Sequence, residues 1–174
     1  MSGQLSVDTL AVRGGYHPQL GDGISPDINL SSTYYLPGDG GGGIVAYGRS
    51  GVPAFAVFEQ AIADVEHAAY ALVFNSGTSA MAAIVGEIEA GQRIVFSHEV
   101  YYGFLEYAEE VLRPRGVVVD HIDLSDLDVA ANAIPGAAMV WVESPTNPHL
   151  TVTDLHGIAK ICADASVPWV CDNT

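Results

Sequence analysis

From residue 53 onward, the apolar positions of the chain follow two alternating patterns. Phe55, Phe58 and Ile62 recur at helical spacing and Pro53 suits a first helical turn, so residues 53–66 are expected to be helical. Short, continuous apolar runs separate this helix from further helical stretches. The predicted strands are residues 70–74, 93–96, 117–120, 139–143 and 168–171, and the other predicted helices are a segment running through residues 81–85 and residues 102–113, 124–133 and 154–165.

Strands that alternate with helices, and that lack an alternating polar face, are typical of a parallel sheet covered by helices on both sides. The pattern therefore predicts an α/β domain over residues 53–174. Residues 1–52 are rich in Gly, Ser and Pro and are expected to form an irregular N-terminal arm. The run Gly38–Gly43 lacks a preceding strand and a helix directly after it, which a phosphate-binding loop requires, and is interpreted as a flexible loop.

The composition narrows the class of function. The net charge is −15, from six Lys and Arg against 21 Asp and Glu, which argues against binding to nucleic acid or to an anionic membrane. No apolar run approaches the roughly 18 residues of a membrane span, and the N-terminus lacks a secretory pattern. The two cysteines form no disulfide framework, so a reducing cytoplasm is expected. The six histidines show no paired ligand spacing, so no metal site is predicted.

The turn Ser76-Gly77-Thr78 is the first candidate for binding chemistry. It follows an apolar run and opens a predicted helix, so its backbone N–H groups and the positive end of the helix form an anion site. Gly77 would let an anion approach the backbone closely. An ordinary turn with a Ser or Thr cap explains the same residues.

Two further segments carry polar groups at strand ends. The segment Glu143–Pro148 holds two prolines, which keep the backbone extended and can fix Asn147 as a hydrogen-bond donor; a plain connector is the alternative. Asp172 ends an apolar strand, where a carboxylate needs a cation or several donors. A protonated pyridine nitrogen is one such cation, and a simple turn aspartate is the alternative.

Together these segments resemble the Cys/Met-metabolism family of pyridoxal-phosphate enzymes, which includes cystathionine γ-synthase, the cystathionine lyases, methionine γ-lyase and the homoserine sulfhydrylases. The resemblance extends from about residue 8 to the end of the chain. It implies the front part of a three-layer α/β/α large domain of the aspartate-aminotransferase type. The matching stretches, in the family's order, are residues 47–49, Pro53, Glu59, residues 74–81, 102–103, 142–148, 152–154 and 172–174.

The resemblance implies how the cofactor phosphate is held. Gly77 and Thr78 match positions whose backbone amides bind the phosphate of pyridoxal 5′-phosphate. Tyr47 and Arg49 match a pair that reaches the phosphate bound by the neighbouring subunit, and an arginine fork suits a phosphate dianion.

The resemblance also implies an aromatic residue that stacks on the cofactor ring and assists proton transfer. Two adjacent tyrosines, Tyr101 and Tyr102, compete for this role. Tyr102 is preferred because Gly103 follows it, as in the family's Tyr-Gly pair.

The remaining contacts to the ring are implied in the same way. Asn147 matches the donor to the phenolic oxygen of the cofactor, and Asp172 matches the partner of the pyridine nitrogen. Thr174 lies beside that contact. Tyr102 and Asp172 are therefore the expected catalytic residues. Trp141, in a predicted strand, is interpreted as a core or interface residue.

The chain departs from the family at several positions. Val52 precedes Pro53 where the family usually has Asn, and Thr78 stands where methionine is common. Phe104-Leu105 replaces a Gly-Thr type of pair, which puts the choice of substrate in doubt.

The family's Schiff-base lysine follows the segment that matches residues 172–174, and the single lysine here is Lys160. Helical geometry turns Lys160 about 200° away from the apolar Ile158, toward solvent. The hypothesis is a split enzyme that catalyses elimination or replacement at Cβ or Cγ of a homoserine ester or sulfur amino acid. A second polypeptide would supply the lysine and the C-terminal domain, in a dimer of heterodimers or a larger assembly. The alternatives are a non-catalytic cofactor-binding or regulatory remnant, an expression fragment of an intact enzyme, and an unrelated α/β binding domain.

Overall fold

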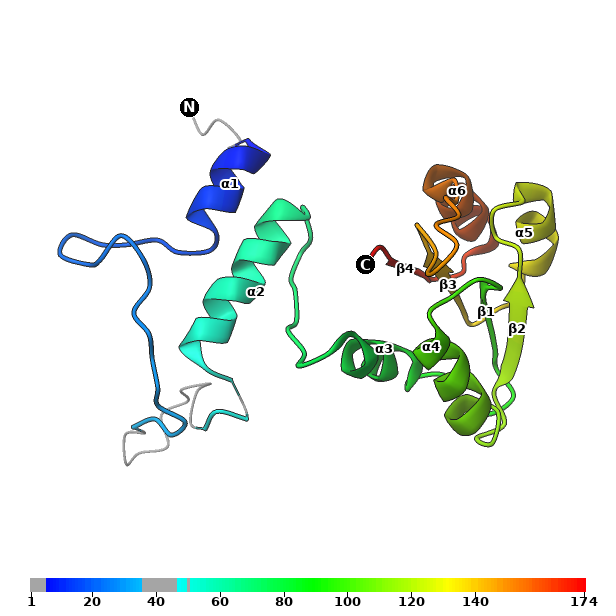
Figure 1. Ribbon diagram of the computed structural model, residues 1–174, viewed down its shortest axis with the longest axis horizontal. Coiled ribbons are helices and arrows are strands. Elements are labelled where there is room, and N and C mark those ends of the chain that lie inside the picture. Colours follow the sequence, from blue (N-terminus) through cyan, green and yellow to red (C-terminus); the bar gives the residue numbers. More distant parts are fainter. Residues whose placement is uncertain (1–5, 36–46, 50) are drawn as a thin grey trace. The chain divides into compact units, whose positions relative to one another are not determined.

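The computed structural model describes residues 6–35, 47–49 and 51–174. The Gly38–Gly43 run, interpreted as a flexible loop, lies outside these residues. The chain divides into two compact units, the first ending at Asn75 and the second covering Ser76–Thr174 (Figure 1).

The second unit is built on a parallel sheet of four strands in the order β2-β1-β3-β4. The strands alternate with helices along the chain, as the apolar pattern predicts. The strands are β1 (Arg93–Ser97), β2 (Val118–Ile122), β3 (Met139–Glu143) and β4 (Trp169–Asp172), and the helices are α3 (Gly77–Val85), α4 (Tyr102–Tyr107), the π-helical turn η1 (Ala108–Leu112), α5 (Leu127–Ala133) and α6 (Leu155–Ala165).

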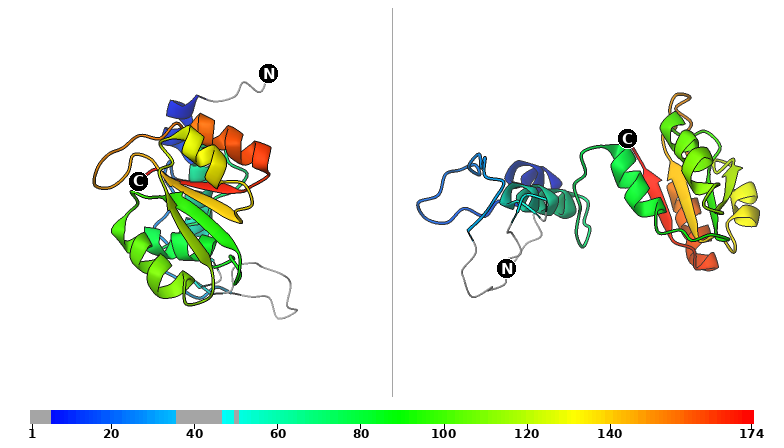
Figure 2. Two further views of the ribbon diagram at one scale, coloured as in Figure 1. Left: turned by 90° about the vertical axis from the view of Figure 1, so that its right-hand side faces the viewer. Right: turned by 90° about the horizontal axis from the view of Figure 1, so that it is seen from below.

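Helices cover both faces of this sheet, with α3 and α4 on one side and α5 and α6 on the other (Figure 2). Successive strand residues point to opposite faces, so each strand contributes to two separate cores. Phe96 and Trp141 pack with residues of α3 and α4, whereas Val95 and Val140 pack with residues of α5 and α6. This arrangement confirms the predicted three-layer α/β/α domain.

The strand predicted at residues 70–74 is not formed, and this prediction is wrong. A strand needs a neighbouring strand to pair its backbone groups, and no strand in the described part of the chain pairs with this segment. The Val73 N–H instead donates to the Glu59 carboxylate at 3.0 Å. Tyr70 and Leu72 remain largely exposed.

The first unit contains two helices that pack against each other, α1 (Val7–Arg13) and α2 (Pro53–Val65). The helix α1 corrects the expectation of a wholly irregular arm. Ser6 caps it by accepting the Thr9 N–H at 3.3 Å. The backbone then crosses close to α2 at Gly15, where φ is +62° and a Cβ atom would lie 2.2 Å from the Val57 carbonyl oxygen.

The described residues of the first unit are mostly exposed. Ala63 is the single buried residue among its described residues, whereas Phe55 and Phe58 are half exposed. None of the helices in the described parts of either unit is long and apolar enough to cross a lipid bilayer.

We predict that Ile158→Ala lowers the free energy of unfolding by about 2–5 kcal/mol, because Ile158 is fully buried between α6 and the sheet. The matched control is Lys160→Ala, on the exposed side of the same helix, with an expected change below about 0.5 kcal/mol. Urea unfolding of the two variants measures the difference. Equal losses would contradict this assignment of the buried face of α6.

Candidate functional site

A cavity of about 510 Å³ opens at the carboxyl edge of the sheet, and its lining comes entirely from the second unit. The last residues of β3 and β4, Glu143 and Asp172, are register partners, so their side chains leave the sheet at the same edge. In open α/β sheets this edge is where ligands bind. The lining residues are Gly77, Thr78, Met81, Tyr101, Phe104, Trp141, Glu143, Pro145, Thr146, Asn147, Leu150, Asp172 and Thr174.

The N-terminus of α3 forms one part of the cavity wall. Ser76 caps the helix and its hydroxyl accepts the Ser79 N–H at 3.1 Å. The first N–H groups of a helix have no partner within the helix, and those of Gly77 and Thr78 are at this end. A Cβ atom added to Gly77 would meet nothing within 4 Å, so the backbone here is open to a ligand.

The loop after β3 carries Asn147 to the cavity. Its ends are tied together by hydrogen bonds from the Thr146 N–H to the Thr151 carbonyl at 3.0 Å and from the Leu150 N–H to the Thr146 carbonyl at 2.8 Å. The peptide bonds before Pro145 and Pro148 are both cis. The loop is therefore a closed turn, and it presents Asn147 at the cavity.

At the end of β4, Thr174 donates twice to the carboxylate of Asp172. Its N–H lies 3.0 Å and its hydroxyl 2.6 Å from Asp172 Oδ1. Both bonds end on Oδ1, and Oδ2 accepts no hydrogen bond within the described residues.

The adjacent Cys171 thiol has a raised pKa. Burial is the larger cause, and the negative charge of the Asp172 carboxylate is the smaller one. The thiol therefore stays protonated at neutral pH.

Of the two adjacent tyrosines, Tyr101 lines the cavity and Tyr102 does not. Tyr102 is 70% exposed, and its hydroxyl lies 3.4 Å from Glu106 Oε1. The Tyr101 ring lies over Gly103, where a Cβ atom would come within 2.5 Å of Tyr101 Cε1. The glycine therefore makes room for the tyrosine two positions before it. The preference for Tyr102 does not match this geometry.

Trp141 and Phe104 form an aromatic part of the wall. Their ring centroids lie 4.7 Å apart in an edge-to-face arrangement. Trp141 is buried, and its indole N–H has no hydrogen-bond partner among the residues that the structure describes. A buried donor of this kind is costly unless a ligand or water accepts from it. From the sequence, Trp141 was interpreted as a core or interface residue, and its position at the cavity was not predicted.

Tyr47 and Arg49 belong to the first unit. The guanidinium carbon of Arg49 lies 5.0 Å from the centre of the Tyr47 ring, within the range of a cation–π contact. The two side chains thus form a pair, and their contact with a phosphate stays a prediction. Lys160 is exposed on α6, as helical geometry predicts.

The structure brings together Gly77, Thr78, Asn147, Asp172 and Thr174 around one cavity. The lining residues that sequence reasoning did not assign to it include Tyr101, Phe104, Trp141 and Glu143. Gly103 indicates that a nearby aromatic ring needs space, but in the sequence it fits either Tyr101 or Tyr102.

A parallel α/β sheet with a ligand-sized cavity at its carboxyl edge defines a large class of small-molecule-binding proteins. Comparison with known proteins narrows the class. The sequence profile of the family described as Cys/Met metabolism PLP-dependent enzyme matches residues 8–174. The chain therefore belongs to this family, whose cofactor is pyridoxal 5′-phosphate. The resemblance noted in the sequence is confirmed.

Individual relatives agree with this assignment. Cystathionine gamma-synthase of Mycobacterium tuberculosis is 35% identical over 171 residues, covering 95% of this chain and 44% of that protein. Human cystathionine gamma-lyase is 33% identical over 170 residues, covering 95% and 42%. The crystal structure of cystathionine gamma-lyase from Lactobacillus plantarum complexed with L-serine matches with a TM-score of 0.90 and 30% identity, covering 98% of this chain and 45% of that one. The chain thus spans less than half the length of these relatives.

We predict that Gly103→Ala displaces the Tyr101 ring, because the added methyl group would overlap it. The ring resonances of Tyr101 in an NMR spectrum of the full chain report the displacement. Tyr102→Phe is the matched control, and it should leave those resonances in place because the Tyr102 side chain points to solvent. Unchanged Tyr101 resonances in the alanine variant would contradict the ring position described here.

Proposed function

We propose that this chain forms the cofactor-binding part of a pyridoxal-phosphate enzyme that catalyses elimination or replacement at Cβ or Cγ of an amino acid. The expected substrates are homoserine esters or sulfur amino acids, and a second polypeptide would supply the lysine. The observation that carries the proposal is the convergence of Gly77, Thr78, Asn147 and Asp172 on one cavity. These residues come from three separate segments of the chain, in the family's order.

The residues present fit this cofactor. The open N-terminus of α3 at Gly77 and Thr78 suits its phosphate, because helix N-termini bind anions. The cavity volume of about 510 Å³ lies in the range of small-molecule sites. The indole N–H of Trp141, which has no partner in the described part of the chain, supplies a further donor for a bound group or a water molecule. Tyr101, which lines the cavity, is better placed than Tyr102 to stack on the ring.

Asp172 would act on the ring nitrogen. Thr174 orients the carboxylate through Oδ1. Oδ2 is therefore available to accept a hydrogen bond from a protonated ring nitrogen. When bound, pyridoxal 5′-phosphate supplies an electron sink for negative charge at the substrate Cα, and that sink depends on a protonated ring. Asp172 would keep the proton on the ring nitrogen, and Asn147 would donate to the phenolic oxygen.

Charge balance at the cavity supports a contribution from outside the second unit. Among the residues that the structure describes, the lining contains two carboxylates, Glu143 and Asp172, and no Lys, Arg or His side chain. A phosphate dianion in such surroundings needs cationic partners beyond the helix amides. Arg49 of a neighbouring copy and a lysine of a second polypeptide would supply that charge.

Lys160 does not fit the role of the missing lysine. Schiff-base lysines are buried amines with a lowered pKa. Lys160 is exposed on α6, and it is the sole lysine of the 174 residues. The lysine would therefore lie outside this sequence.

The first unit supports assembly with other chains. It buries only Ala63 among its described residues, and half-exposed aromatic residues lie along α2. Such a segment gains stability chiefly by packing against a partner. We expect a dimer of heterodimers or a larger assembly, in which Tyr47 and Arg49 reach the cofactor of a neighbouring subunit.

Borohydride reduction tests the source of the lysine. The chain is co-expressed with a candidate partner, the product of any neighbouring reading frame that encodes a Ser-x-Thr-Lys segment. The complex is loaded with pyridoxal 5′-phosphate, reduced and mapped by mass spectrometry. We predict a phosphopyridoxyl label on the lysine of the second polypeptide and none on Lys160, because Lys160 faces solvent. Stoichiometric labelling of Lys160 would contradict the split site. Tight cofactor binding by this chain alone, without any partner, would favour the non-catalytic alternative.

We predict that Asp172→Ala lowers kcat by about 10²–10³-fold, the scale of losing one charge-stabilising group in a closed site. Cofactor affinity should change much less, because the phosphate contacts at Gly77 and Thr78 remain. The matched control is Asp164→Ala, an exposed carboxylate on α6, which should leave both quantities unchanged. Steady-state kinetics and cofactor titration of the assembled enzyme separate the two effects. Near-normal turnover in the Asp172 variant would remove this residue from the mechanism.

A further inference from the structure

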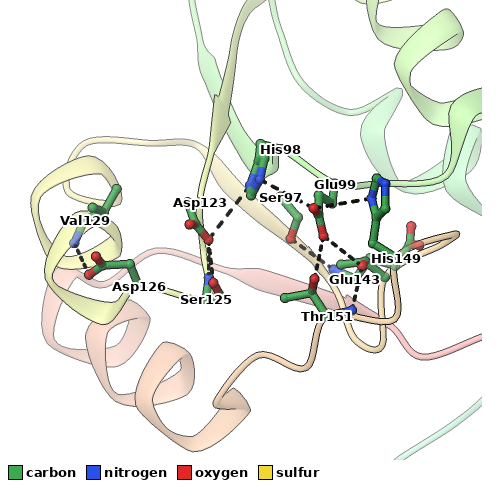
Figure 3. Close-up of polar contacts among 11 residues, drawn as sticks. Ser97, His98, Glu99, Asp123, Ser125, Asp126, Val129, Glu143, His149 and Thr151 are labelled. Carbon is green, nitrogen blue, oxygen red and sulfur yellow. Dashed lines mark hydrogen bonds and ion pairs between the residues drawn. The ribbon is translucent and has the colours of Figure 1, made fainter.

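Two loops that lie next to each other at the carboxyl edge of the sheet contribute to the cavity. One follows β1 and leads to Tyr101, and the other, residues 144–151, follows β3 and carries Asn147. Because β1 and β3 are paired neighbours, both loops leave the same edge side by side. Figure 3 shows the polar side chains between them, among them Glu143 and Glu99.

Glu143 joins the two loops through its carboxylate. The Tyr101 N–H donates to Glu143 Oε2 and the Asn147 N–H donates to Oε1, each at 2.7 Å. Glu143 is only 4% exposed. A buried carboxylate is costly unless its oxygens accept hydrogen bonds, and here each oxygen accepts one from the backbone. One side chain therefore holds the backbone of both Tyr101 and Asn147.

Glu99 ties the outer part of the same loop. Its Oε2 accepts from the Thr151 hydroxyl at 2.6 Å and from the Thr146 hydroxyl at 3.2 Å, and Oε1 lies 3.3 Å from His149 Nδ1. The Thr151 hydrogen bond is the largest cause that lowers the pKa of Glu99, against a smaller opposing effect of partial burial. Glu99 is thus ionised at neutral pH and acts as an acceptor. It fixes the outer end of the loop while Glu143 fixes the end at the cavity.

We propose that Glu143 is a positioning residue, which sets the distance between Tyr101 and Asn147 so that both meet the ring of a bound cofactor. This inference rests on the proposed function of the cavity. Glu143 would not touch the reacting atoms. Its carboxylate accepts hydrogen bonds from two backbone N–H groups of the cavity wall. These groups belong to Tyr101 and Asn147, which lie 46 positions apart along the chain.

The substitution Glu143→Gln isolates this role because it preserves the shape of the side chain. A glutamine has one carbonyl oxygen and one NH₂ group, so it accepts from one of the two N–H groups and presents a donor to the other. One buried backbone N–H is then left without an acceptor, which is a large perturbation for a small change in volume. Glu109→Gln is the matched control, since Glu109 pairs with Arg113 at 2.7 Å on the exposed side of η1, away from the cavity lining.

The test compares two ligands on the assembled protein. Inorganic phosphate probes the phosphate contacts alone, including those at the N-terminus of α3, whereas pyridoxal 5′-phosphate also requires the ring contacts. We expect Glu143→Gln to weaken pyridoxal 5′-phosphate binding about tenfold and to change phosphate binding less than about twofold, with faster hydrogen exchange at the Tyr101 and Asn147 amides. Glu109→Gln should change none of these quantities.

Equal effects of Glu143→Gln on both ligands, or no effect on either, would overturn the positioning role. Failure of the unaltered protein to bind pyridoxal 5′-phosphate would instead overturn the proposed function, so the two failures are distinguishable. Should the glutamine variant not fold, Glu143→Asp answers the same question. Its shorter side chain keeps the charge but cannot reach both N–H groups, and the same selective loss of pyridoxal 5′-phosphate binding is expected.

Discussion

Parallel pairing of β1, β3 and β4 is the constraint on which the site depends. Parallel strands place all their carboxyl ends at one edge, and the register sets Glu143 opposite Asp172 there. Every strand-end loop then starts within reach of the others. The helix N-terminus at Gly77, the loop of Asn147 and the carboxylate of Asp172 come from distant parts of the sequence. The sheet, together with the packing of α3 on one of its faces, brings them to one cavity.

Much of this fold is predictable from the sequence, because buried parallel strands are continuous apolar runs between amphipathic helices. The segment at residues 70–74 has the same apolar character and is not a strand, since strand formation depends on a distant partner as well as on local composition. In the site, Asp172 and Asn147 were predictable from motifs. The choice between Tyr101 and Tyr102 was not, because it depends on which ring lies over Gly103. The role of Glu143 was not predictable either, because its hydrogen-bond partner Tyr101 lies 42 positions away in the sequence.

The carboxylates of Glu143 and Asp172, which line the cavity, are held by donors that carry no formal charge. Glu143 is held by two backbone N–H groups and Asp172 by the N–H and hydroxyl of Thr174. Neutral donors of this kind hold a carboxylate in place without neutralising it, so its charge remains available to a cationic group. An acidic protein with few basic residues can therefore keep an ordered polar edge while leaving the cations to its ligands and partners.

The small buried surface of the described residues of the first unit affects how readily the chain would be cut by proteases in the cell. A segment that buries one alanine among its described residues is expected to unfold locally at a low cost in free energy. Proteases cut such segments in proportion to the time they spend open. In the proposed assembly, chains that assemble slowly would lose these residues first, so the amount of intact protein would follow the supply of the proposed partner chain rather than its own rate of synthesis.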